Sequence, residues 1–340
     1  MPCLVRPVGS TPSLGDPLVD EYLRFTAARV RANTLTAQAF DLKVFFTVVP
    51  KAPQQVTVTD VLLFIEAQRA PRRGGNVIRL ADGEAGLAAS TIKRRLATVS
   101  SLFDYLFLRG VCDRNPVPRS LGARHARPDG RGHGGRRGAP LVRAPRKLPR
   151  VLAPAEVSAL TGALRTDRDR AMVALMVHGG LRRCEVLGLR FEHVQVGDRR
   201  VFVADGKGGH QRLVPVADIF FTNLASYLSR ERPAEAVDDH VFVVLKGPNR
   251  GRPLTAAGLD EVMAGARGRA GLSHASCHEL RHTCFTRLRE AGMALEAIQA
   301  QAGHASIETT RVYLHLSNDW LAGEYQRAMA ILDGLHEEEP

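Results

Sequence analysis

Residues 201–216, VFVADGKGGHQRLVPV, contain two runs of β-prone residues on either side of a glycine-rich turn. Valine and phenylalanine favour a pleated, half-buried backbone, and closely spaced glycines allow a tight reversal, so the stretch predicts a β-hairpin. Lys207 stands among the glycines at its tip. Most of the flanking sequence has helical spacing instead, so we expect a mainly α-helical fold with a small antiparallel β-sheet.

The elements around the hairpin are expected as follows. Residues 167–180, DRDRAMVALMVHGG, predict a buried helix, and residues 181–194, LRRCEVLGLRFEHV, predict a second one. A short strand is expected at residues 240–244, HVFVV, and helices continue to the end of the chain. This half of the protein therefore reads as an α+β domain.

The first third of the chain predicts a small bundle of about four helices, with apolar residues at helical spacing in residues 18–30, 36–49, 59–70 and 90–110. In the last of these, STIKRRLATVSSLFDYLFLRG, a serine is placed to cap the start and Gly110 to end the helix. Its first turns also contain polar and basic residues that either form a solvated face or could contact phosphate groups. These are Ser90, Thr91, Lys93, Arg94 and Arg95.

Residues 118–150 separate the two halves and are rich in Arg, Gly and Pro, with almost no apolar periodicity. Such a segment cannot bury enough surface to fold alone, but its arginines would be attracted to a phosphate backbone; a solvated spacer is the alternative. The expected organisation is an N-terminal helical domain at residues 1–117, this linker, a second domain at residues 151–325 and a tail at residues 326–340.

Composition bounds the class of protein. The chain has 340 residues, of which 44% are hydrophobic and 24% charged, so it can bury the cores of two globular domains. Its net charge of +12 favours a polyanionic partner, with nucleic acid the leading candidate. The N-terminus lacks a signal-peptide pattern, the longest apolar run is too short to span a bilayer, and five cysteines form no disulfide framework. We therefore expect a cytoplasmic, nucleoid-associated protein without membrane contact.

Residues 277–292, CHELRHTCFTRLREAG, follow Ser276, and the Ser-x-x-Glu pattern predicts a helix that starts here and runs to Gly292. His278 and Arg281 share one face near the helix start, where exposed N–H groups and the helix dipole favour an anion. This predicts a phosphate cradle. Two alternatives are a plain amphipathic surface helix and a zinc site. Zinc ligands would come from Cys277, His278, His282 and Cys284, but their offsets spread around the helix.

Three further positions, together with Lys207, carry groups suited to phosphoryl transfer. In residues 179–185, GGLRRCE, Arg182 precedes Glu185 by one helical turn, so the carboxylate can hold the guanidinium in a fixed pose. Near the C-terminus, residues 302–315, AGHASIETTRVYLH, place His304 after a glycine and Tyr313 nine residues later. Each of these residues alone has an ordinary structural explanation, but the ordered set indicates one site.

At these positions the chain resembles the tyrosine recombinase, or phage integrase, family. GGLRRCE is similar to the family's first-arginine box, GKGG to its β-hairpin lysine, HELRH to its His-x-x-Arg box, and the C-terminal segment to its tyrosine motif. The resemblance covers residues 151 to 320. It implies a tyrosine recombinase catalytic domain there and, less directly, an N-terminal core-binding (SAM-like) DNA-binding domain.

The resemblance also implies a mechanism and partners. The implied catalytic residues are Arg182, Lys207, His278, Arg281, His304 and the nucleophile Tyr313, with Glu185 as support for Arg182. No cofactor or metal is implied. The expected partner is double-stranded DNA, bound by a homotetramer at synapsis. The expected function is site-specific recombination through a 3′-phosphotyrosyl intermediate, with strands exchanged between two duplexes. Integration, excision, dimer resolution and transposition, as in a mobile element, all fit this function.

Two alternatives remain open at this point. A type IB topoisomerase-like or hairpin-resolving strand transferase uses a similar Arg, Lys, His and Tyr set, and would act on one duplex instead of joining two. A non-catalytic DNA-binding regulator belongs to another class. The sequence does not specify the target site, an accessory protein or the direction of recombination.

Overall fold

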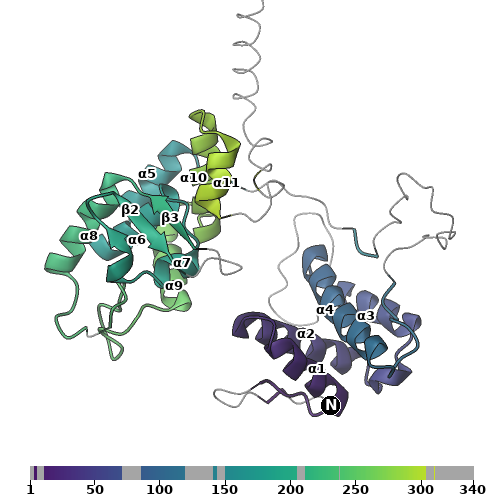
Figure 1. The fold of residues 1–340 in the computed structure, drawn as a ribbon. Coiled ribbons are helices and arrows are strands. Elements are labelled where there is room, and N and C mark those ends of the chain that lie inside the picture. Colours follow the sequence, from purple (N-terminus) through teal and green to yellow (C-terminus); the bar gives the residue numbers. More distant parts are fainter. Residues whose placement is uncertain are drawn as a thin grey trace, which may run out of the picture. The chain divides into compact units, whose positions relative to one another are not determined.

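In a computed structural model, the chain divides into two compact units, Met1–Arg146 and Lys147–Pro340. The structure describes residues 4–5, 11–70, 86–118, 141–143, 150–204, 211–236, 238–303 and 310. Figure 1 shows both units, each mostly helical, and the second with a small sheet. The predicted fold class, mainly α with a small antiparallel sheet, is confirmed.

Within its described residues, the first unit has four α-helices around an aromatic core. The phenyl ring of Phe45 packs edge-on against Phe64 and Phe103, with centroid distances of 5.0 and 6.4 Å, and all three side chains are fully buried. The predicted four-helix bundle is therefore present. Its elements are α1 (Pro17–Ala27), α2 (Ala32–Val48), the short 3-10 helix η1 (Pro53–Gln55), α3 (Val58–Arg69) and α4 (Ala89–Leu108).

The start of α4 differs from the sequence expectation. Ala88 is the N-cap residue and makes no side-chain cap, whereas Ser90 lies inside the first helical turn and is exposed. The predicted end is correct, because Gly110 adopts a φ of +69° just after the helix.

The second unit packs its helices around α6 (Asp167–Val177), whose residues 171–177 are all buried. This helix contacts α7, α8 and α10. The elements are α5 (Pro154–Gly162), α6, α7 (Arg183–Leu187), η2 (Phe191–His193), β1 (Val194–Gln195), β2 (Arg200–Val203), β3 (Arg212–Pro215), α8 (Asp218–Arg230), α9 (Ala256–Arg269), α10 (Cys277–Glu290) and α11 (Leu295–Ala302).

The sheet has the order β1-β2-β3 and is antiparallel throughout. Val201 pairs with Val214 and Val203 pairs with Arg212, which confirms the predicted hairpin. All three valines are buried, so one face of the sheet covers the core. Figure 1 shows β2 and β3 beside each other near α6 and α7.

Two predictions for this unit were wrong in extent. The helix expected over residues 181–194 is only five residues long, because the chain leaves α7 at Gly188 and its next backbone groups bond elsewhere: Val241 N–H donates to Leu189 O at 2.8 Å. The strand expected at residues 240–244 joins no sheet. It forms isolated bridges to Arg190 and Pro253, because its neighbours on the two sides are different short segments.

Within the described part of the chain, none of the helices combines the length and the apolar character needed to cross a lipid bilayer.

Candidate active site

Helix α10 begins and ends close to where its sequence predicts. Ser276 is the N-cap and its Oγ accepts from Glu279 N–H at 3.3 Å. The carboxylate of Glu279 lies 3.3 Å from His274 Nδ1, so the reciprocal half of the expected capping box is replaced by a contact to the preceding loop. The helix closes at Gly292, which has a φ of +90°. The cap fixes the first turn and so fixes the direction of the side chains that follow.

Arg281 on this helix is buried and ties three segments together. Its guanidinium donates to the backbone carbonyl of Gly180, in the loop after α6, and to that of Ala302, the last residue of α11, at 2.7 Å. It also stacks over the Phe285 ring at 4.8 Å. The side chain is only 3% exposed, so its pose is set by protein contacts before any substrate arrives.

The loop that accepts from Arg281 requires a glycine. Gly180 has a φ of +67°, and a Cβ at this position would lie 2.4 Å from Cζ of the fully buried Phe285 ring. Any larger residue would push the ring or the loop away. The glycine pair thus permits the close approach of the loop to α10, and the Arg281 pose depends on that approach.

Arg182 is held by a buried carboxylate. Arg182 Nη1 donates to Glu185 Oε1 at 2.8 Å, and the Arg182 backbone N–H donates to Glu185 Oε2 at 2.9 Å. The Glu185 side chain is fully buried, whereas that of Arg182 is 20% exposed. The neighbouring Arg183 instead points to the exposed carboxylate of Asp260. Of the two arginines, Arg182 is therefore the one with a fixed and partly open guanidinium.

Arg212, which the sequence motifs did not indicate, forms a cluster with Arg182 and Glu185. Its Nη1 and Nη2 donate to the two Glu185 oxygens at 3.0 and 2.8 Å, and its Nε donates to Gln301 O at 2.8 Å. The available signal was strand parity: Arg212 is in phase with the buried Val214 on β3, so its side chain must enter the interior. A charged residue in that phase needs a buried partner.

Two arginines consequently hold the end of α11. The last carbonyls of a helix have no partner within it, and here Arg212 takes Gln301 O while Arg281 takes Ala302 O. The amide of Gln301 adds a bond to Gly179 O at 3.3 Å. Arg212 and Arg281 thus fix the position of Gln301 and Ala302, which immediately precede the segment that contains His304 and Tyr313.

The negative charge of Glu185 is stabilised by the positive charges of Arg182 and Arg212. Burial alone would raise the pKa of Glu185, but the hydrogen bonds and charges of Arg212 and Arg182 outweigh it and hold the pKa below its ordinary value. The carboxylate is therefore ionised at neutral pH between two guanidinium groups.

His278 lies near both expected catalytic arginines. Desolvation, followed by the positive charges of Arg281 and Arg182, lowers the pKa of His278. The imidazole is thus neutral at neutral pH in the absence of a ligand. Its Nε2 lies 2.9 Å from Nε2 of His282, one helical turn along α10. Arg281 on the same helix and Arg182 from a distant part of the sequence thus both disfavour a proton on His278.

The cysteines near this helix are protonated thiols. Burial raises the pKa of Cys277 to about 11 and that of Cys284 to about 12. Cys284 Sγ also donates to His178 O at 3.3 Å and so points away from the helix start. Among the described residues, no group of three or more His, Cys, Asp or Glu side chains is arranged to hold a metal ion.

The basic residues of α4 divide into two kinds. Arg95 is buried and contacts Gln68 and the buried Asp41, the latter at 3.7 Å, so it stabilises the bundle instead of standing on its surface. Arg94 also pairs with Asp41 but is half exposed. Lys93 is exposed on the same turn. The surface available to a partner here is therefore smaller than the sequence suggests.

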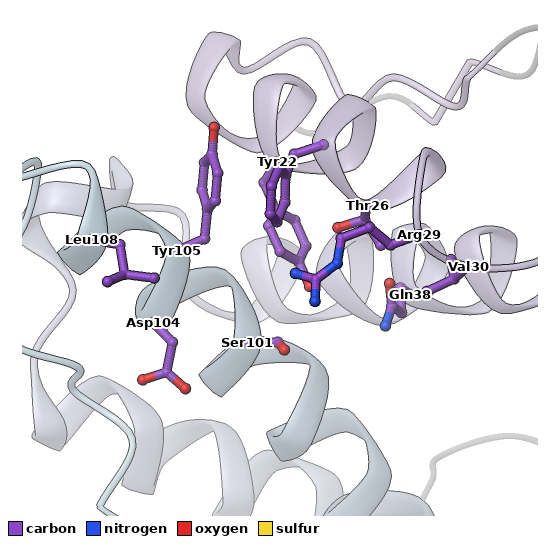
Figure 2. A pocket seen from close by; sticks show the side chains of 10 residues that line it. Tyr22, Thr26, Arg29, Val30, Gln38, Ser101, Asp104, Tyr105 and Leu108 are labelled. Carbon is purple, nitrogen blue, oxygen red and sulfur yellow. The ribbon is translucent and has the colours of Figure 1, made fainter.

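The first unit also has an open aromatic cleft of about 390 Å³ between α1 and α4. Figure 2 shows Tyr22 and Tyr105 on its wall, with Arg29 and Asp104 at its sides. The ring of Tyr105 lies 5.7 Å from that of Tyr22 and 5.0 Å from that of Phe25. The cleft lies in the first unit, and none of the expected catalytic residues that the structure describes lines it.

Lys207, His304 and Tyr313 lie outside the described residues. The structure therefore describes three of the six expected catalytic residues, and Glu185 with them.

Comparison with known proteins identifies the family. The phage integrase family model matches residues 150–319. A tyrosine recombinase XerC from Serratia marcescens is 29% identical over 322 residues, covering 93% of this chain and 95% of the relative. Another XerC, from Yersinia pestis, is 31% identical over 249 residues, covering 72% and 74%.

Solved structures agree on the fold. The Tn1549 transposon integrase in complex with circular intermediate DNA matches with a TM-score of 0.64 at 17% identity, covering 87% of this chain and 93% of that one. A lambda integrase dimer bound to a COC′ core site matches with a TM-score of 0.60 at 19% identity, covering 85% and 94%. The chain therefore belongs to the phage integrase family of tyrosine recombinases, enzymes that cleave and rejoin DNA in site-specific recombination.

Proposed function

We propose that this protein cleaves and rejoins double-stranded DNA through a covalent link between Tyr313 and a 3′ phosphate, and exchanges strands between two duplexes. The observation that carries the proposal is a chain of hydrogen bonds that links the two arginines, Arg182 and Arg281. The buried Glu185 carboxylate accepts from both Arg182 and Arg212, and Arg212 and Arg281 donate to adjacent carbonyls at the end of α11. A site with fixed cations and a neutral imidazole suits an anionic substrate.

The chemistry faces two obstacles. A phosphodiester is negatively charged and repels nucleophiles, and a tyrosine with a pKa near 10 is mostly protonated at neutral pH. Guanidinium groups can donate two hydrogen bonds to phosphate oxygens and so stabilise the extra charge of the pentacoordinate transition state. Each preorganised donor of this kind is worth about 3 kcal/mol. Because Glu185 and the helix-end carbonyls hold the arginines in place, little reorganisation is needed when the charge develops.

The remaining roles come from the family resemblance. Tyr313 Oη attacks phosphorus, His278 accepts its proton, Lys207 protonates the 5′ oxygen that leaves, and His304 donates a hydrogen bond to a phosphate oxygen. The covalent intermediate retains the energy of the phosphodiester bond. The attack of a 5′ hydroxyl from the other duplex then reverses the step and completes the exchange without ATP or a metal ion.

We further propose that residues 1–117 form a core-binding domain and that residues 151–325 hold the active site. Arginines of the linker, residues 118–150, are proposed to contact the phosphate backbone, although Val142 within it is buried in the core of the first unit. Ser90, Thr91, Lys93 and Arg94 are candidates for phosphate contacts, whereas Arg95 is committed to the buried Asp41. Recombination is expected in a homotetramer on DNA in the cytoplasm, and residues 326–340 form a tail beyond the catalytic domain.

The test is a nicked suicide duplex that carries the site this protein prefers, found by selection from a randomised duplex library. We expect an SDS-resistant DNA–protein band that is insensitive to EDTA and absent in Tyr313→Phe. A band that persists in this variant would rule out Tyr313 as the nucleophile. Products also separate the alternatives: joining of two duplexes supports recombination, whereas relaxation of supercoiled DNA alone would support a topoisomerase-like activity.

A further inference from the structure

The second histidine of α10 is not used in the mechanism above, yet it contacts the proposed base directly. His282 Nε2 lies 2.9 Å from His278 Nε2. The ring centroids are 4.3 Å apart and the ring planes make an angle of 81°. The two side chains are four residues apart on one helix, so the contact is set by the helix itself.

This contact constrains the protons of both rings. A neutral imidazole has one N–H and one bare nitrogen, so a hydrogen bond between two Nε2 atoms needs a proton on one of them only. If His282 donates, His278 carries its proton on Nδ1 and has both nitrogens occupied. If His278 donates, its Nδ1 is bare. Only the second arrangement allows His278 to accept a proton while the pair stays intact.

We propose that His282 is a positioning residue that accepts the Nε2–H hydrogen bond of His278 and so keeps His278 Nδ1 unprotonated, ready to receive the phenolic proton of Tyr313. This inference rests on the proposed function, in which His278 is the base for that tyrosine.

The proton balance of the step is simple. The Tyr313 O–H bond breaks and its proton forms an N–H bond at His278 Nδ1, while the oxygen pair forms the bond to phosphorus. The bond from phosphorus to the 5′ oxygen breaks, and that oxygen takes the proton of the general acid. His278 is then an imidazolium that still donates from Nε2 to His282. On rejoining, Nδ1 returns the proton to the tyrosine.

The surroundings keep the imidazole of His282 uncharged. Burial, with smaller contributions from His278 and Arg281, lowers the pKa of His282 to about 4. His282 is therefore uncharged at neutral pH and does not compete for the proton. Arg281 and Arg182 disfavour a cation at His278, whereas Glu279 favours one. A neutral hydrogen-bond acceptor offsets part of that repulsion when the imidazolium forms.

The first test is the tautomer of His278 in the full-length protein. With ¹⁵N-labelled histidine, long-range ¹H–¹⁵N correlations distinguish a protonated Nε2 from a protonated Nδ1, and His278→Gln assigns the signals. We expect the Nε2–H form in the wild type and in His282→Gln, whose side-chain oxygen can accept the same bond, and a mixture of tautomers in His282→Phe. An Nδ1–H form in the wild type would overturn the proposal, as would an unchanged tautomer in His282→Phe.

The second test measures single-turnover cleavage of the suicide duplex. A general base contributes about 10²-fold to 10⁴-fold, so losing its orientation should slow His282→Phe by roughly 10-fold to 100-fold. His282→Gln should recover most of the rate, which a role in packing alone would not predict. Cleavage by His282→Phe at the wild-type rate would refute the positioning role. If the Tyr313→Phe protein still forms the covalent adduct, Tyr313 is not the nucleophile and the proposed function fails. The tautomer measurement is independent of that result and still shows whether His282 accepts a hydrogen bond from His278 Nε2.

Discussion

Replacing Glu185 with glutamine should strongly destabilise the second unit. The fully buried carboxylate accepts hydrogen bonds from both Arg212 Nη atoms, from Arg182 Nη1 and from the Arg182 backbone N–H, at 2.8 to 3.0 Å. Glutamine keeps the shape but removes the charge and turns one acceptor into a donor that faces other donors. Removing one partner from a buried ion pair costs about 3–5 kcal/mol.

The assay is thermal unfolding by calorimetry. For a unit of this size 1 kcal/mol shifts Tm by about 2–4 °C, so Glu185→Gln should lower the Tm of the second unit by roughly 6–20 °C. Asp260→Asn is the matched control. The partner of Asp260, Arg183, lies on the same short helix as Glu185. Both members of this pair are exposed, however, Asp260 by 57% and Arg183 by 43%. An exposed pair contributes about 0–1 kcal/mol, so this variant should melt close to the wild type.

The pH dependence gives the sign of the effect. The pKa of Glu185 is lowered in the folded protein, so its stabilisation is fully present above the unfolded pKa of about 4.3 and is lost as pH falls through the folded pKa. The difference in unfolding free energy between wild type and Glu185→Gln should therefore be constant near neutral pH and shrink below about pH 4.3. Equal stability of the two proteins at pH 7, or a difference that does not shrink in acid, would refute the reasoning.

Two further pairs of variants test the packing and the DNA surface. Gly180→Ala should lower the free energy of unfolding by about 3 kcal/mol or more, because it adds a clash with the Phe285 ring to the strain of a positive φ. Gly110→Ala, which has a similar φ but open space around the Cβ, should lower it by about 1–2 kcal/mol. Urea unfolding measures both losses, and equal values would show that the clash with Phe285 has no effect. Arg95→Met should lower the Tm of the first unit, because it removes a partner of the buried Asp41. Lys93→Ala should leave that Tm unchanged but weaken DNA binding and reduce the slope of log K against log salt concentration by about one. An unchanged slope in Lys93→Ala would show that Lys93 does not contact a phosphate.

Local chemistry was sufficient to predict much of this fold. The hairpin follows from β-prone runs around glycines, and α10 follows from its serine cap and terminal Gly292. The prediction of a strand at residues 240–244 was wrong. The sequence indicates β propensity there, but it does not show that the segment pairs only through single bridges, with Arg190 on one side and Pro253 on the other. Pairing between distant segments is a property of the tertiary fold.

The candidate site shows the same division. The link between Arg182 and Glu185 was predictable from their spacing along a helix. Arg212 was missed because its role depends on the strand register and on the end of α11, which are distant in sequence. The burial of Arg95 was likewise not visible, since its partner Asp41 lies on another helix.

The central claim is that one phenol, brought to the arginine cluster, forms the covalent bond to DNA. The most direct measurement is mass spectrometry of the trapped protein–DNA adduct after digestion with nuclease and protease. We predict a single modified peptide that carries a nucleotide 3′ phosphate on Tyr313. Attachment to any other residue, or a nucleotide joined through its 5′ phosphate, would contradict the account.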